Sequence, residues 1–241
     1  MNKKPIFFGD YPVEEIYHVL KNRRHVYEYD TDKVPEKQLI EDLLWKAWKV
    51  TPSKNNFMPY HCNVLGPEHV TEKHSIWMKS KQNKKQINEH NIEDHKEEGD
   101  NRYFEHLSTA PYLLVFTQRV CEPNEFYRKC IEEGDYFEQM HEHEIDSMLR
   151  TVTVEVGMWM ANLSAFALEI GLNTSTIACF PYKPFFAKNS MSAWADLPWV
   201  KHPVVLLGSI GKAKVTRRES MNFIQRKDDK KPEPETVIKW I

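Results

Sequence analysis

A long apolar segment in the second half of the chain is the feature that most constrains its fold. From about Ile145 to Ile170, apolar side chains fall on nearly every face of a predicted helix. A membrane-spanning helix is not expected to carry two carboxylates, yet Glu155 and Glu169 lie inside this segment. Gly171 follows as a glycine cap. We therefore expect a helix that is covered on all sides within a globular protein, with a partner subunit as a plausible part of the cover.

The composition indicates a soluble protein with one core. The 241 residues can bury a sizeable interior, and 41% of them are hydrophobic. A net charge of −2 argues against nucleic acid or a membrane surface as the main partner. Four scattered cysteines without a C-x-x-C pair, and the lack of a signal-peptide pattern, predict reduced thiols in a cytoplasmic protein. We find neither an internal repeat nor a boundary between two cores, so residues 1–241 are interpreted as a single domain.

The remaining segments predict a mixture of helices and strands, and hence an α+β domain. Two polar excursions are expected, about 68–108 and 121–147. Within the first, residues 68–100 hold few apolar side chains and predict solvated helix or a mobile excursion rather than core, whereas the second is rich in Glu and aromatic residues. The C-terminal arm, 226–241, ends in an alternating pattern over Thr236–Ile241, which is typical of a strand that docks on an exposed sheet edge. Helices are also expected over 12–20 and 35–51, and strands over 60–65, 110–117, 174–180 and 203–208.

Two short segments near the N-terminus indicate the chemistry. Arg23, Arg24 and His25 follow an amphipathic helix, and adjacent guanidiniums are suited to holding a phosphate. The Pro/Ser/Asn turn at Thr51–Tyr60 offers amides and short side chains to a flat polar ligand. Taken singly, the first is explained as a solvated basic helix end and the second as ordinary turn chemistry. Together they suggest a phosphorylated cofactor.

Other residues that invite a different chemistry are better explained structurally. His141 and His143 are two residues apart, so on a helix they point away from each other and cannot share a metal. His90 and His95 lie in a polar excursion, and we predict no metal site. Cys179 follows Ile and Ala in a β-prone segment, where a small buried hydrophobe is more common than a nucleophile.

Four motifs along the chain occur in a recognisable order. They are Arg23-Arg24-His25 with Tyr29-Asp30, the turn from Pro52-Ser53 to Pro59-Tyr60, the helix end at 165–172, and Gly208 followed by Arg217-Arg218. Over about residues 12–225 this arrangement resembles the nitroreductase family of FMN-dependent oxidoreductases. The stretch at 68–108 and its ending Leu107–Pro111 are also similar to the iodotyrosine deiodinase branch of that superfamily. Against the family pattern, His25 replaces a usual Ser, Tyr27 a common Arg or Lys, and Cys179 a common Gly.

The resemblance implies a nitroreductase-like fold and an obligate homodimer. That fold has a central, mostly antiparallel sheet flanked by helices, with the long buried helix at the dimer interface and two FMN molecules between the subunits. The Ala178 amide would donate to flavin N5. The implied FMN-binding residues are Arg23, Arg24, His25, Arg217 and Arg218 at the phosphate, Pro52, Ser53, Lys54 and Asn56 from the partner subunit, and Thr176, Ile177, Ala178 and Cys179 along the flavin.

The resemblance also implies a reaction. Because the flavin carries the electronic step, no catalytic side chain is required. NAD(P)H would reduce the flavin at N5, and a small aromatic acceptor would then take two electrons in a ping-pong cycle. Ile177 and Ala178 offer no hydroxyl beside N5, which favours nitroaromatic or quinone-like acceptors. A reductive dehalogenase and a non-catalytic flavin-binding protein are the alternatives. Should the polar excursions close as a lid, Tyr103, Phe104, Phe126, Tyr127 and Tyr136 could stack on the substrate.

Overall fold

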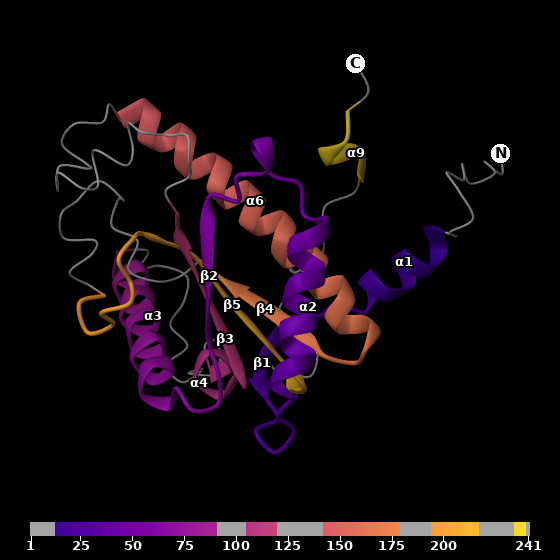
Figure 1. Ribbon diagram of the computed structural model, residues 1–241, viewed down its shortest axis with the longest axis horizontal. Coiled ribbons are helices and arrows are strands. Elements are labelled where there is room, and N and C mark those ends of the chain that lie inside the picture. Colours follow the sequence, from indigo (N-terminus) through magenta and orange to yellow (C-terminus); the bar gives the residue numbers. More distant parts are fainter. Residues whose placement is uncertain (1–12, 91–104, 120–141, 179–193, 217–233, 240–241) are drawn as a thin grey trace.

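The computed structural model describes residues 13–90, 105–119, 142–178, 194–216 and 234–239 (Figure 1). The elements are α1 (Val13–Lys21), β1 (Val26–Tyr29), α2 (Lys37–Val50), the 3-10 turn η1 (Lys54–Asn56), β2 (Tyr60–Leu65), α3 (Val70–His90), α4 (Glu105–Thr109), β3 (Tyr112–Gln118), α6 (Glu142–Glu169), β4 (Asn173–Ile177), β5 (Val204–Gly211), β6 (Ala213–Thr216) and α9 (Pro234–Val237).

A four-stranded antiparallel sheet forms the centre of the fold. Its strand order is β2-β3-β5-β4, and each neighbouring pair is antiparallel. The central strand β3 is buried along its whole length. Because successive side chains of a strand point to opposite faces, such a strand needs apolar cover on both sides of the sheet. The predicted α+β class with a central antiparallel sheet is confirmed.

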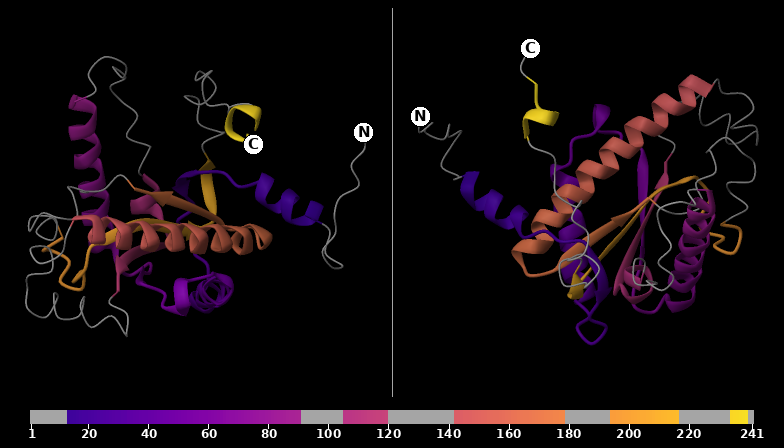
Figure 2. Two further views of the ribbon diagram at one scale, coloured as in Figure 1. Left: turned by 90° about the horizontal axis from the view of Figure 1, so that it is seen from above. Right: turned by 180° about the vertical axis from the view of Figure 1, so that it is seen from behind.

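The helices α6 and α2 cover one face of this sheet (Figure 2). Leu114 and Phe116 of β3 pack there with Val156, Trp159 and other buried residues of α6. The ring of Phe116 meets that of Trp159 edge to face, with their centroids 5.1 Å apart. From α2, Ile40, Leu43 and Ala47 complete this cluster; they repeat at three- and four-residue spacing, as one face of a helix requires.

The opposite face is covered by α3, α4 and the segment 194–200. Here the alternate β3 residues Leu113 and Val115 meet Ile76 of α3 and Leu107 of α4. The expectation that residues 68–100 lie outside the core is therefore wrong for the first half of α3. That expectation rested on the average polarity of the segment, but one side of a helix is enough to bury Ile76.

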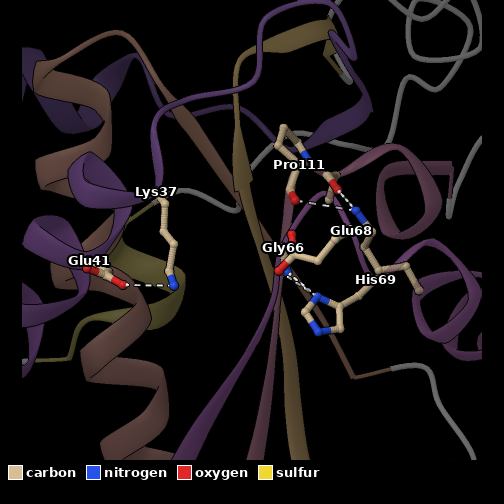
Figure 3. Close-up of polar contacts among 8 residues, drawn as sticks. Lys37, Glu41, Gly66, Glu68, His69 and Pro111 are labelled. Atoms are coloured by element: carbon tan, nitrogen blue, oxygen red, sulfur yellow. Dashed lines mark hydrogen bonds and ion pairs between the residues drawn. The ribbon is translucent and has the colours of Figure 1, made fainter.

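Lys73 is a buried cation on the same side of α3. It is 4% exposed, and its Nζ donates to the carbonyl oxygens of Ala110 and Pro111, at 3.0 and 3.4 Å. Burial lowers the pKa of Lys73 below its ordinary value. Figure 3 shows Pro111 beside the turn that leads from β2 into α3, where the Gly66 amide donates to Nδ1 of His69 at 3.1 Å. Lys73 thus satisfies carbonyls at the junction between α4 and β3.

The long helix α6 is only partly covered in the single chain. Residues Thr151–Glu169 are long and apolar enough to cross a membrane, and 44% of this stretch is buried. The buried side packs on the sheet, as in the core helix of a soluble protein, but Val154 is 60% and Ile170 46% exposed. The single chain therefore covers only part of the helix, and the expected cover by a partner subunit stays a prediction.

A two-stranded antiparallel sheet, β1 with β6, adjoins the main sheet. Fully buried Tyr29 links the two, since its hydroxyl lies 3.0 Å from Oγ of Ser209 in β5. The described part of the C-terminal arm, 234–239, does not continue the sheet: Pro234–Val237 forms one helical turn, and Ile238 N–H donates to Pro234 O at 2.7 Å. The predicted strand is thus wrong at Thr236–Lys239, because Pro234 favours the first turn of a helix.

We predict that Lys73→Ala destabilises the protein by about 1–3 kcal/mol, because two buried carbonyl oxygens lose their donor. Thermal and urea unfolding, followed by circular dichroism, would measure the loss. Exposed Thr71 on the same helix provides the control, and Thr71→Ala should change the free energy of unfolding by less than about 0.5 kcal/mol. Equal effects of the two substitutions would show that the Lys73 contacts contribute nothing.

Candidate functional site

Three of the five basic residues predicted to hold a phosphate, namely Arg23, Arg24 and His25, lie between α1 and β1. Arg23 is exposed, whereas Arg24 and His25 are half-buried. Nη1 of Arg24 donates to the carbonyl oxygens of Lys21 and Arg23, at 2.7 Å each. Arg24 therefore caps the carboxyl end of α1, where a cation also offsets the helix dipole. A guanidinium has five donor hydrogens, and Nη1 serves this cap.

Ser175 of β4 connects this basic segment to the main sheet. Its Oγ accepts the Val26 N–H at 2.8 Å and lies 3.3 Å from Nδ1 of His25. Val26 is paired with Thr216, the residue that directly precedes Arg217 in the sequence. The structure thus places His25 beside β4. Sequence reasoning missed Ser175; the polar run Thr174–Thr176 within a buried strand was the available signal.

The residues predicted to contact the flavin come directly after Ser175 in the sequence and begin within β4. This strand is at one end of the sheet order, so part of its backbone hydrogen-bonding capacity faces outward. Thr176 and Ala178 are exposed, and Ile177 is buried in the core. Cys179, Arg217 and Arg218 lie outside the described residues, as do the aromatics Tyr103, Phe104, Phe126, Tyr127 and Tyr136.

The Thr51–Met58 turn, which joins α2 to β2, is internally hydrogen-bonded. Asn56 N–H donates to Ser53 O and Phe57 N–H to Lys54 O, both at 3.1 Å. Met58 N–H donates to Oγ of Ser53 at 2.9 Å. The amides of Asn56, Phe57 and Met58 are therefore bonded within the turn, and the expectation that the turn offers its amides to a ligand is wrong for these three. Exposed Lys54 and Asn56, and the hydroxyl proton of half-buried Ser53, are the groups that can meet a ligand, beside exposed Pro52.

The turn and the basic segment lie at opposite corners of the sheet. The strand pairings place Ser175 level with Leu65, at the far end of β2 from Tyr60. Five residue steps along β2 and three strand spacings across the sheet correspond to about 17 and 14 Å, or roughly 20 Å in all. A small ligand bound at His25 is therefore not expected to reach Ser53 of the same chain.

An aromatic groove of about 610 Å³ adjoins the turn, between α2 and β2. Its walls include Trp45, Trp48, Phe57, Tyr60, His61 and Arg119. Burial and the Arg119 cation lower the pKa of His61, which favours the neutral imidazole. The sequence alone does not predict this groove, because its walls come from four separate parts of the chain.

Within the described ranges, the side chains present form neither a metal site nor a reactive thiol. No group of three or more His, Cys, Asp or Glu side chains is placed to hold a metal there. Cys62 is a free thiol, and burial raises its pKa, so it stays protonated near neutral pH.

Several solved structures have a fold similar to that of this chain. A candidate NAD(P)H:FMN oxidoreductase from Staphylococcus epidermidis is 14% identical, with a TM-score of 0.60 over 95% of this chain and 97% of that one. A nitroreductase-like protein from Streptococcus mutans is 16% identical, with a TM-score of 0.55 over 85% and 92%. A candidate nitroreductase from Exiguobacterium sibiricum, in complex with FMN, is 16% identical, with a TM-score of 0.53 over 83% and 89%.

The sequence comparisons assign the family. No match was found among curated proteins. Residues 20–212, more than three quarters of the chain, match the nitroreductase family. This range includes α1 from Leu20 onward and extends through the four-stranded sheet and the Thr51–Met58 turn. The chain therefore belongs to the nitroreductase family.

Proposed function

We propose that this protein is an FMN-dependent oxidoreductase that uses NAD(P)H to reduce nitroaromatic or quinone-like acceptors. The observation that carries the proposal is the contact of the Arg23–His25 segment with β4 through Ser175. This contact places cationic side chains, which could donate hydrogen bonds to a phosphate, beside the outward-facing edge of β4. Family membership and the FMN complex of the Exiguobacterium sibiricum protein support the same cofactor.

The side chains available suit FMN. Arg23, Arg24 and His25, together with Arg217 and Arg218, would hold the phosphate by charge-assisted hydrogen bonds. The backbone of 176–179 would follow the flavin ring, with the Ala178 amide as the donor to N5. From the partner subunit, Ser53 and Asn56 would add hydrogen bonds, beside Pro52 and Lys54.

When bound, FMN supplies the transfer of two electrons from NAD(P)H to the acceptor in a ping-pong cycle. The protein binds and orients the reactants. Ile177 is turned into the core and Ala178 has no polar side chain, so neither offers a hydroxyl next to N5. This supports hydride-type reduction over reductive dehalogenation.

Exposed apolar surface supports a homodimer. Large apolar side chains stay exposed on three helices of the single chain: Ile16 and Tyr17 on α1, Trp45 and Trp48 on α2, and Val154 on α6. Such a concentration is typical of a protein–protein interface. Two copies would also let the turn of one chain meet the basic segment of the other, which a single chain keeps roughly 20 Å apart.

The exposed side of α6 suits close packing against a second copy. Gly157 and Ala161 are exposed and four residues apart, so they lie on one face of the helix. Among the residues that the structure describes, a Cβ atom at Gly157 would meet nothing within 4 Å. Small side chains let two helix backbones approach closely, and we propose that this face lies in the dimer interface.

Arg23→Ala should weaken FMN binding about 10- to 100-fold, the effect of losing a hydrogen bond between charged groups. Titration of FMN fluorescence with flavin-free protein would give the dissociation constant. Lys21→Ala removes a neighbouring exposed charge as the control and should have a smaller effect. An unchanged constant for Arg23→Ala would refute its role at the phosphate.

Steady-state kinetics should distinguish the proposed reaction from its alternatives. With NADH or NADPH as donor, a nitroaromatic or quinone acceptor should give parallel double-reciprocal plots, because donor and acceptor use the site in turn. Release of iodide from an iodotyrosine, without nitroaromatic reduction, would favour the dehalogenase instead. Purified protein that binds no flavin would reject both.

A bulky side chain at Gly157 should disrupt the dimer without a clash inside the single chain. Light scattering of the wild type should give the mass of two 28.6 kDa chains, and Gly157→Phe that of one. Gly157→Ala is the matched control: it should stay dimeric and gain up to about 1 kcal/mol from helix propensity. A dimeric Gly157→Phe protein would exclude this face from the interface.

A further inference from the structure

The Thr51–Met58 turn has a strained backbone. Asn56 and Met58 have positive φ angles of 57° and 47°, in the left-handed region. Asn tolerates this region, but Met lacks a short polar side chain to compensate. Residues in such conformations persist only where their surroundings impose them, and they concentrate at functional sites.

Helix α6 holds the turn from one side. Oε1 of Glu155 accepts the Lys54 N–H at 2.9 Å, and Nδ2 of Asn162 donates to Oγ1 of Thr51 at 2.9 Å. Glu155 and Asn162 are seven residues apart, about two helical turns, and so share one face of α6. The buried helix thereby fixes the turn at two points.

Arg119, directly after β3, holds the turn from the other side. Its Nε donates to Met58 O at 3.0 Å, and its Nη2 donates to Phe57 O. Its own amide donates to Pro59 O at 3.0 Å. The planar guanidinium fixes two successive carbonyl oxygens in one geometry, which an ammonium group cannot reproduce.

Glu155 holds the turn from a buried position, which is unfavourable for the stability of the fold. The side chain is 3% exposed, and its Oε2 is buried without a hydrogen-bond partner among the residues that the structure describes. A buried carboxylate is often less favourable for stability than a neutral replacement. In this position the carboxylate provides a charge-assisted acceptor for the Lys54 amide, at the start of the strained segment.

We propose that Glu155 and Arg119 are positioning residues that clamp the Thr51–Met58 turn in its strained conformation. In this conformation the turn presents Ser53 and Asn56 to a ligand. The proposal rests on the proposed function in one respect, namely that the ligand is the flavin bound by the second copy. Neither residue is required to touch the flavin.

Hydrogen exchange of the flavin-free, full-length protein tests the clamp directly. In Glu155→Leu, which removes the acceptor, the Lys54 amide should exchange about ten-fold faster or more. Glu155→Gln keeps a weaker acceptor and should show a smaller change in the same direction. Arg119→Lys should accelerate exchange over 56–58. Exposed Glu169 on the same helix supplies the control, since Glu169→Gln should leave the turn unchanged.

Flavin affinity and melting temperature separate positioning from a purely structural role. Glu155→Gln should melt no lower than the wild type, because a buried charge is removed, yet should bind FMN several-fold more weakly. A lower melting temperature with unchanged FMN affinity would overturn the positioning role. An unchanged Lys54 exchange rate in Glu155→Leu would overturn the clamp itself.

The combined variant gives a further check. Because both residues act on one turn, the effects of Glu155→Gln and Arg119→Lys on exchange should not be additive. Strict additivity would mean that the two contacts act independently and would contradict a shared clamp. A wild-type protein that binds no flavin would instead reject the proposed function, while the exchange measurements still decide whether the clamp exists.

Discussion

The packing of α6 on one face of the four-stranded sheet is the interaction on which the rest of the structure depends. Buried residues such as Val156 and Leu163 join the helix to β3 and β5 and form the larger of the core clusters. The same helix carries Glu155 and Asn162 to the Thr51–Met58 turn. Its other side, with Gly157, stays exposed in the single chain. One element thus serves the core and the turn, and it carries the surface assigned here to a second copy.

The division of the candidate site between two corners of the sheet follows from this architecture. Strand β4 holds the basic segment through Ser175, and the loop before β2 forms the turn. Because β2 and β4 are the outer strands of the sheet, its full width separates them. In the proposed dimer each site combines the basic segment of one chain with the turn of the other. Association would then be required for complete flavin binding.

Local patterns predicted most of the fold but not all of it. The strand Tyr60–Leu65 was predicted with its observed bounds, because alternation and a following Gly-Pro are local signals. Burial of α3 was missed, since it depends on what Ile76 meets after folding rather than on average polarity. The strand β1 was not predicted either; its pairing with β6 joins residues nearly 200 positions apart. The C-terminal strand was predicted from alternation, but Pro234 begins a helical turn there instead.

In the candidate site, too, some features follow from neighbouring residues in the sequence and others from residues that are far apart in it. The sequence by itself determined the α+β class, the long core helix, and the presence of the Arg23–His25 segment and the Pro/Ser/Asn turn, because residue type and spacing encode these. Only the tertiary structure decided that Ser175 holds His25, that the turn uses its own amides, and that Glu155 and Arg119 grip it from two sides. Arg119 and Glu155 lie about 60 and 100 residues from the turn along the chain. Hydrogen bonds between such distant groups have no period in the sequence, so they are settled only when the sheet and α6 bring the groups together.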